Sequence, residues 1–219
     1  MSMTRTQVLR SAAALFVLLG FASGAQAGPP LICHPFDAGT APLLPWAPNA
    51  RGWNSPDPSY DLKKLTADTL RLLSPDAPIL ARMENMRRAT IYASKDRAIA
   101  AELLVAVMGR ALTEAGRGSH DALAWFDAGY LVESYRQASG LHQWSMLGDA
   151  ERATGAAARA PRRIDGYAWV KQALDLTGPN PEIEFAASLI QEGPLSAEHR
   201  RRAVAGAKAG SLLAKNLQK

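Results

Sequence analysis

The 219-residue sequence contains a single cysteine, Cys33, and only four histidines. One cysteine cannot form an internal disulfide, so the fold has to be stabilised by hydrophobic burial, which a chain of this length can supply. The histidines, at positions 34, 120, 142 and 199, do not show the spacing of a zinc site. We therefore expect no disulfide within the chain, no metal and no other cofactor.

Sequence signatures of catalysis are also lacking. The chain has no Gly-x-Ser-x-Gly, no His-Glu-x-x-His, no phosphate-binding loop and no Cys-x-x-Cys-His haem attachment motif. Each of these motifs places a nucleophile, a metal or a phosphate in a fixed geometry, and nothing in the sequence replaces them. The sequence therefore does not indicate an enzyme.

A strong excess of charge of one sign is missing too. There are 25 Lys and Arg against 20 Asp and Glu, and two of the arginines, Arg5 and Arg10, lie in an N-terminal segment that we expect to be removed. The remaining excess of three is too small for a nucleic-acid-binding surface. We interpret the local basic groups as solvated helix faces, with a docking patch for an acidic partner or a phosphate-rich envelope surface as the alternative: Arg87–Arg88, Arg159, Arg162, Arg163 and His199–Arg202.

Long hydrophobic runs are confined to the N-terminus. The run SAAALFVLLGFASG follows Arg5 and Arg10 and precedes Ala25–Gln26–Ala27, the pattern of a signal peptide cleaved after Ala27. The run is shorter than the roughly 20 apolar residues of a membrane-spanning helix, and a retained membrane anchor is the alternative. We expect residues 1–27 to direct export to the periplasm or the medium, with no transmembrane anchor after cleavage.

Residues 28–58 contain eight of the fourteen prolines and no helical periodicity. Proline fixes φ and removes a hydrogen-bond donor, so this segment cannot form the middle of a sheet. Its apolar residues argue against a disordered linker and predict an extended arm that packs on the rest of the protein. Trp46 and Trp53 are the expected anchors.

Cys33 and His34 lie within this arm, between Pro30 and Pro35. Ile32 precedes the cysteine, whereas a lipoprotein signal has a small residue at that position, so lipidation is not expected. Three readings stay open: a buried thiol that behaves as a small hydrophobe, an exposed thiol that forms a disulfide with a partner, and a thiol that acts with His34 as a nucleophile or metal ligand.

From residue 59 onward the pattern is helical throughout. Apolar residues recur at helical spacing, and glycine, proline and capping residues separate the segments. No alternating run of β-branched residues is present, so the sequence predicts an all-α domain over 59–219. The first expected helix ends before Pro75. The next helices are expected at 78–94, at 95–116 after a Ser94 cap, at 120–139 after a Ser119 cap, and in the alanine-rich segment 141–161. A pair of helices within 165–190 and a last helix from Ser196 to Leu217 follow.

The segment 165–190 contains Ala173-Leu174-x-Leu176 followed by Asn180-Pro181-Glu182. In this pattern it resembles the junction between successive tetratricopeptide-type repeats, with Asn180 as a helix cap and Pro181 at the first helical position. The leader with its following arm is similar to those of exported bacterial proteins without an assigned activity. The resemblance implies antiparallel helix hairpins stacked as a short, irregular tetratricopeptide-like solenoid.

Stacked hairpins create a groove, so the sequence favours an exported helical-repeat binding or scaffold protein of the cell envelope that recognises a peptide or protein partner. The candidate groove residues are Glu84, Arg88, Trp125 and Tyr130. The alternative is a small exported hydrolase or redox or metal protein that uses Cys33 and His34. Adjacent residues of an extended strand point to opposite faces, which weighs against that alternative.

Overall fold

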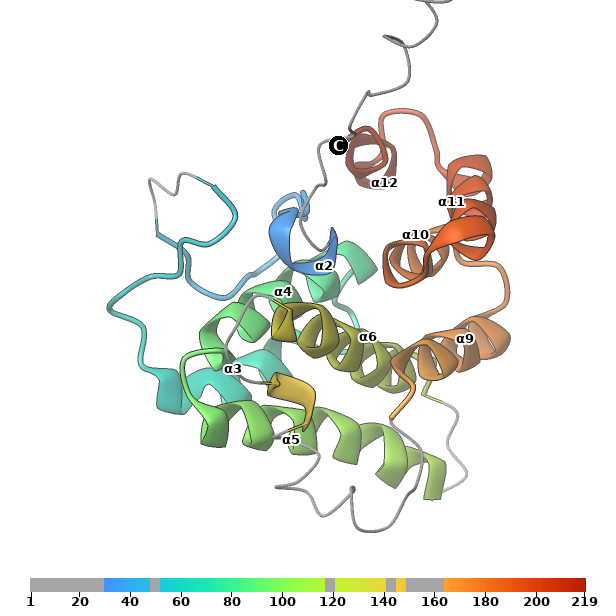
Figure 1. Ribbon diagram of the computed structural model, residues 1–219. Coiled ribbons are helices and arrows are strands. Elements are labelled where there is room, and N and C mark those ends of the chain that lie inside the picture. Colours follow the sequence, from blue (N-terminus) through green and yellow to red (C-terminus); the bar gives the residue numbers. More distant parts are fainter. Residues whose placement is uncertain (1–29, 48–51, 117–120, 141–144, 149–163) are drawn as a thin grey trace, which may run out of the picture.

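The computed structural model describes residues 30–47, 52–116, 121–140, 145–148 and 164–219. Within these ranges the chain is helical, with connecting turns and no strand, so the predicted all-α class is confirmed. The proposed signal peptide, the Ser119 cap and most of the alanine-rich segment 141–161 lie outside the described residues. Figure 1 shows the helices packed around a central helix, α6.

The first group of helices consists of η1 (Leu62–Lys64), α3 (Leu65–Leu72), α4 (Ile79–Ala93), α5 (Arg97–Gly116) and α6 (Ala122–Ser139). Aspartates provide most of their N-terminal caps: Asp61, Asp96 and Asp121 each accept hydrogen bonds from backbone N–H groups of the following turn. The prediction that Ser94 caps α5 is wrong, because its hydroxyl bonds back to the carbonyl of Ile91.

The second group consists of α9 (Gly166–Thr177), α10 (Pro181–Ile190), α11 (Gly193–Gly206) and α12 (Leu212–Asn216). As predicted, Asn180 caps α10 and Pro181 occupies its first turn. The single helix predicted from Ser196 to Leu217 is wrong. The chain leaves the helix at Ala207, passes through Gly210 with a positive φ of 72°, and starts α12 after a Ser211 cap.

Helix α6 joins the two groups. It packs against α4 and α5 on the side of the first group and against α9 on the side of the second. The contact with α9 is close because glycines face each other: a Cβ on Gly129 would lie 2.4 Å from the carbonyl oxygen of Gly166. Small residues at such a crossing allow two helix backbones to approach, and a side chain at either position would force them apart.

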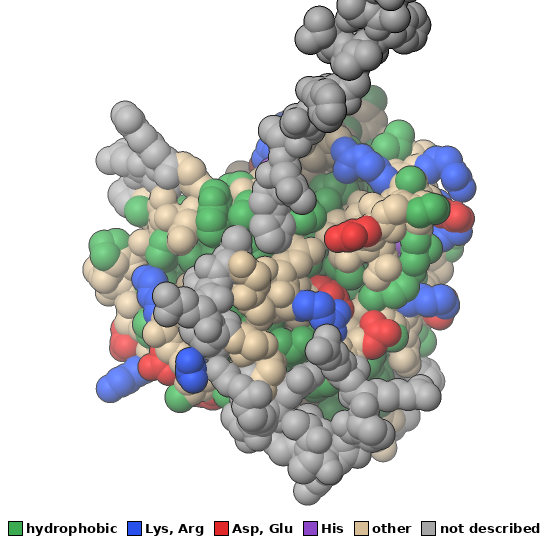
Figure 2. Space-filling model, viewed as in Figure 1, with side chains coloured by type: hydrophobic (Ala, Val, Ile, Leu, Met, Phe, Trp, Pro, Cys, Tyr) green, Lys and Arg blue, Asp and Glu red, His purple; other side chains and the backbone are tan. Residues whose placement is uncertain are grey.

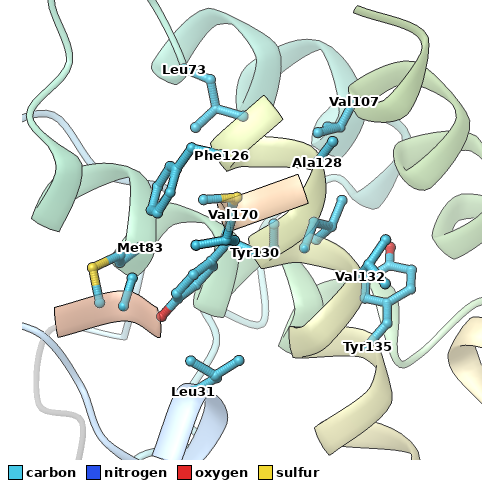
Figure 3. Close-up of a cluster of buried hydrophobic side chains, with 14 of the residues drawn as sticks. Leu31, Leu73, Met83, Val107, Phe126, Ala128, Tyr130, Val132, Tyr135 and Val170 are labelled. Carbon is cyan, nitrogen blue, oxygen red and sulfur yellow. The ribbon is translucent and has the colours of Figure 1, made fainter. Parts of the chain in front are cut away.

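The core is built around α6 as well. Figure 3 shows Phe126 and Tyr130 of this helix between Met83, Leu73 and Val170, with Leu31 nearby. All six side chains are buried. In a solenoid each repeat contacts only its neighbours, whereas α6 also touches α2 (Pro30–Cys33) and α10. The stacked-repeat arrangement predicted from the sequence is thus not shown by the structure, which supports the coarser all-helical class.

The proline-rich arm lies across α4, α6 and α10. Leu31, Ile32, Phe36 and Leu44 are buried in the core, and the expected anchors Trp46 and Trp53 are only partly buried against it. The arm is not extended throughout, because Pro30–Cys33 forms the short helix α2. Pro30 can start a helix since its missing N–H would have no partner there, and Pro35 prevents the helix from continuing.

Candidate functional site

The first polar site in the structure is a row of side chains on α4 that holds the arm. These side chains hydrogen-bond to backbone groups of residues 32–57: Glu84, Asn85, Arg87, Arg88 and Tyr92. Glu84 accepts from the Phe36 N–H at 3.0 Å, and Asn85 accepts from the Leu44 N–H at 2.8 Å. Because they engage backbone atoms, these contacts position an extended chain almost independently of its side chains.

The arginines of α4 continue this row. Arg87 donates to the carbonyls of Ile32 and Trp53, and Arg88 donates to the carbonyl of Leu44. Both guanidinium groups also lie over the ring of Trp46, at 5.0 and 5.2 Å from its centroid. The aromatic ring therefore attracts the same cations that bind the arm backbone.

Glu84 forms ion pairs with both arginines. It is 1% exposed and bonds to Arg87 through both carboxylate oxygens, at 2.8 and 2.9 Å, and to Arg88 at 2.7 Å. Burial alone would raise the pKa of Glu84, but the hydrogen bond and charge of Arg87, the hydrogen bond of Arg88 and the N–H of Phe36 outweigh it and hold that pKa below its ordinary value. The carboxylate thus stays ionised in the interior.

A second buried pair behaves in the opposite way. Asp127 of α6 accepts a 2.6 Å hydrogen bond from Arg82 of α4, while its other carboxylate oxygen has no partner among the described residues. Burial dominates here and raises the pKa of Asp127 to about 7, against the weaker effects of Arg82 and the more distant Arg110. One close guanidinium therefore does not offset the effect of burial on the pKa of this carboxyl.

The four residues predicted to line a groove are therefore mostly interior. Glu84 and Tyr130 are buried, and the Tyr130 hydroxyl has no hydrogen-bond partner among the described residues. Trp125 is nearly buried and packs edge-on against Trp169 of α9. Arg88 is partly buried beneath the arm. Glu84 and Arg88 do bind an extended peptide segment, but that segment is the protein's own arm, so these residues do not form an open groove.

Cys33 and His34 come after the buried pair Leu31–Ile32 and are both half-buried. Burial raises the pKa of the Cys33 thiol, and the positive charge of Arg87 opposes it only in part. A raised pKa leaves less thiolate, which is the reactive form. No hydrogen bond between the thiol and the His34 ring is present, so the structure does not join them into a nucleophile and base.

An open groove lies elsewhere, between α9, α10 and α11. Its cavity volume is about 990 Å³, and its walls combine apolar, charged and aromatic side chains. They include Tyr167 and Lys171 from α9, Glu184 from α10, and Leu195, His199 and Arg202 from α11. In Figure 2, acidic, basic and apolar side chains alternate on the right-hand side of the molecule, where these helices lie.

A hydrogen-bonded chain of three side chains forms the floor of this groove. The Tyr167 hydroxyl lies 2.8 Å from Nε2 of His199, and Nδ1 of His199 lies 2.5 Å from Glu184. His199 is 3% exposed, so the imidazole is buried and has a partner on each nitrogen. Since each residue comes from a different helix, this chain fixes the positions of α9, α10 and α11 relative to each other.

Charges on the groove rim are paired. Lys171 bonds to Asp175 one turn along α9, and Arg202 bonds to Glu198 and lies 3.5 Å from Glu184. Burial raises the pKa of Tyr167, so its hydroxyl keeps its proton for the hydrogen bond with His199. A mixed, nearly neutral rim suits a polypeptide better than a strongly charged small molecule.

The sequence does not indicate that Tyr167, His199 and Glu184 form a group. The residues are separated by 15 and 32 positions, and none belongs to a recognisable local motif. The only available signal was the first-turn glutamates of the Asn-Pro-Glu helix, which a helix-capping interpretation explains equally well. His199 was interpreted as part of a solvated basic run, but the structure places it inside.

Among the described residues, no group of three or more His, Cys, Asp or Glu side chains is arranged to hold a metal ion. The described helices also include none with the length and apolar character needed to cross a membrane. Comparisons with protein-family models, with curated proteins and with solved structures find no significant match for this chain.

Proposed function

We propose that this chain is a binding or scaffold protein that acts after export to the cell envelope and recognises a peptide segment of a partner protein. The observation that supports this is the open groove between α9, α10 and α11, which has a volume of about 990 Å³. Its volume and its mixed walls, drawn from three helices, match the requirements of a polypeptide segment.

The geometry of the groove supports the same function. The hydrogen-bonded chain of Tyr167, His199 and Glu184 fixes the three helices in advance, so little conformational entropy is lost when a partner binds. Leu195 is 41% exposed at the edge of the groove and provides an apolar anchoring point. The protein also already binds one extended segment, its arm, by side-chain contacts to backbone groups.

Site-specific photocrosslinking in the producing cell tests the proposal. A photoreactive amino acid at Ala205, an exposed residue that lines the groove, should give one dominant crosslinked partner. The same amino acid at Ala67, an exposed residue of α3 far from the groove in sequence and fold, is the matched control. A peptide from the crosslinked region of the partner should then bind the purified chain.

The variant Ala205→Trp completes the test, because a large side chain there narrows the groove without entering the core. Peptide affinity should fall at least about ten-fold in Ala205→Trp and stay unchanged in Ala67→Trp. Equal crosslinking at Ala205 and Ala67, or unchanged affinity in Ala205→Trp, would contradict the proposal.

A further inference from the structure

A second cavity lies on the opposite side of α10 and α11 from the groove. It has a volume of about 250 Å³, is open to solvent on one side, and is lined by the arm, α10, α11 and the C-terminal residues. Figure 1 shows α2, α10 and α12 close together around this position. The lining residues are Pro30, His34, Pro35, Phe36, Phe185, Leu189, Arg200, Asn216 and Lys219.

The walls of this cavity are mainly apolar. Phe36 of the arm and Phe185 of α10 meet edge to face with ring centroids 6.1 Å apart, and Leu189 lies one turn further along α10. Asn216, although polar and buried, is fully engaged, since its side chain bonds to the backbone of Asp37 and to the carbonyl of Leu212. It therefore closes the cavity and does not attract a ligand by an unmet hydrogen bond.

The polar groups of the lining that face solvent are basic. None of the described residues that line the cavity is acidic, whereas Arg200, Lys219 and His34 all contribute to it. Arg200 donates to the carbonyl of Leu217 at 2.7 Å, and Lys219 donates to the carbonyl of Pro35 at 3.3 Å. Within the described residues, neither cation is paired with a carboxylate, in contrast to Arg202 and Lys171 on the groove side.

From this arrangement we infer that the cavity binds a small apolar monocarboxylate, with its hydrocarbon part between Phe36, Phe185 and Leu189 and its carboxylate at Arg200. A guanidinium has several N–H donors in one plane and matches the geometry of a carboxylate. One of these donors bonds to the Leu217 carbonyl, and the others can bond to the ligand. An amine would be repelled by the positive charge of Arg200. The second carboxylate of a dicarboxylate would have to lie against the apolar wall.

The volume limits the size of the ligand. Since a water molecule in the liquid occupies about 30 Å³, the cavity corresponds to about eight water molecules and admits a ligand of roughly ten non-hydrogen atoms. A phenyl ring with a short acidic side chain satisfies this limit and can add a third ring to the edge-to-face pair. Phenylacetate is therefore a suitable probe.

Calorimetric titration of the full chain with phenylacetate tests the inference. Binding should be saturable with one site, and the uncharged phenylacetamide should bind at least about ten-fold more weakly. Arg200→Gln should lower phenylacetate affinity at least about ten-fold, because it removes the charge-assisted hydrogen bonds. The matched control is Arg201→Gln, an exposed neighbour on α11 outside the cavity, which should change the affinity less than about two-fold.

Leu189→Trp provides the second variant, since the indole fills the cavity from a partly exposed position and should abolish binding. Ala205→Trp, which narrows the opposite groove, should leave phenylacetate binding unchanged, so this site and the proposed peptide site are tested separately. The inference is overturned by an absence of saturable binding, by equal affinity for phenylacetamide, by equal effects of Arg200→Gln and Arg201→Gln, or by unchanged binding in Leu189→Trp.

Discussion

The two halves of the molecule use similar polar groups for opposite purposes. On α4, the Glu84, Arg87 and Arg88 side chains are enclosed by the arm, and the arm backbone provides most of their remaining partners. Between α9 and α11, Glu184, His199 and Tyr167 are also linked, but they form the floor of an open groove. The protein itself occupies the first site and leaves the second one accessible.

This difference indicates how to distinguish structural from functional polar groups in the protein. A buried ionic group that is enclosed by other segments of the protein holds the fold together, and its loss should reduce the free energy of unfolding. A group that is satisfied internally but borders an open cavity can be changed at smaller cost, because water reaches its neighbours.

The largest expected effect is at Glu84. Glu84→Ala removes the one carboxylate that, among the described residues, contacts Arg87 and Arg88, and the buried Arg87 then has no carboxylate partner there. We expect a loss of about 3–5 kcal/mol in the free energy of unfolding, measured by urea denaturation. Glu198→Ala, which removes a solvent-exposed ion pair at the groove, should change it by less than about 1 kcal/mol. Similar losses for both variants would contradict the comparison.

The pH dependence of stability should reveal Asp127. Its pKa in the folded state is raised from 3.8 to about 7, so between about pH 4 and pH 7 the folded protein binds a proton that the unfolded chain has released. This contribution to stability is complete below pH 4 and is lost as the pH rises to 7. Denaturation of the wild type and of Asp127→Asn across this range measures it. The difference in the free energy of unfolding, wild type minus variant, should fall by a few kcal/mol with rising pH, and a rise would contradict the shift.

The glycine contact between α6 and α9 connects the two halves. In Gly129→Ala the new Cβ would lie 2.4 Å from the Gly166 carbonyl oxygen, so α9 must move away from α6. We expect the free energy of unfolding to fall by about 1–3 kcal/mol. Peptide affinity for the groove should also fall, because α9 forms one wall of the groove. Gly109→Ala in α5 is the control: nothing lies within 4 Å of its Cβ, and replacing a helical glycine should stabilise by about 0.5–1 kcal/mol.

The tyrosine on the groove floor should have a smaller effect. Tyr167→Phe removes one hydrogen bond to His199 while the ring contact between the two residues is kept. The expected loss is about 1 kcal/mol in thermal or urea denaturation. A loss as large as that of Glu84→Ala would show that this group supports the fold as strongly as the α4 row does.

The smallest effect is expected at Cys33. The half-buried thiol has a raised pKa and makes no contact with His34 that would activate it, so labelling by a thiol reagent at neutral pH should be slower than that of a free cysteine. Cys33→Ser should change stability by no more than about 0.5 kcal/mol. Rapid labelling of the native protein, or a covalent dimer on a non-reducing gel, would contradict this expectation.

Helix positions could largely be predicted because their signals are local. The apolar spacing lies within the helices, and Pro75, Gly116 and the Asn180–Pro181 cap lie at or near their ends, so α3, α4, α5 and α10 follow these signals closely. The predicted helix boundaries were less accurate where two polar residues compete to cap the same helix. Asp96 caps α5 where Ser94 was expected, since two capping residues close together cannot be ranked from sequence alone.

The candidate site could not be predicted in the same way. The phase of α4 is ambiguous because nearly all of its residues are buried, polar ones included, so no face of the helix stands out as the one that meets solvent. Charged residues are usually exposed, so nothing local in the sequence indicates that Glu84 and Arg88 are covered. Their burial depends on an arm that supplies backbone partners 48 and 44 residues earlier in the chain.

The sequence by itself determined the helical class, the proline-rich character of the arm and the absence of an internal disulfide, because these follow from local periodicity and composition. Only the tertiary structure decided that the arm covers the α4 side chains, that Gly129 meets Gly166, and that Tyr167, Glu184 and His199 converge beside an open groove. These contacts join residues distant in the chain, and their energies depend on burial and on the partners that packing brings within hydrogen-bond distance.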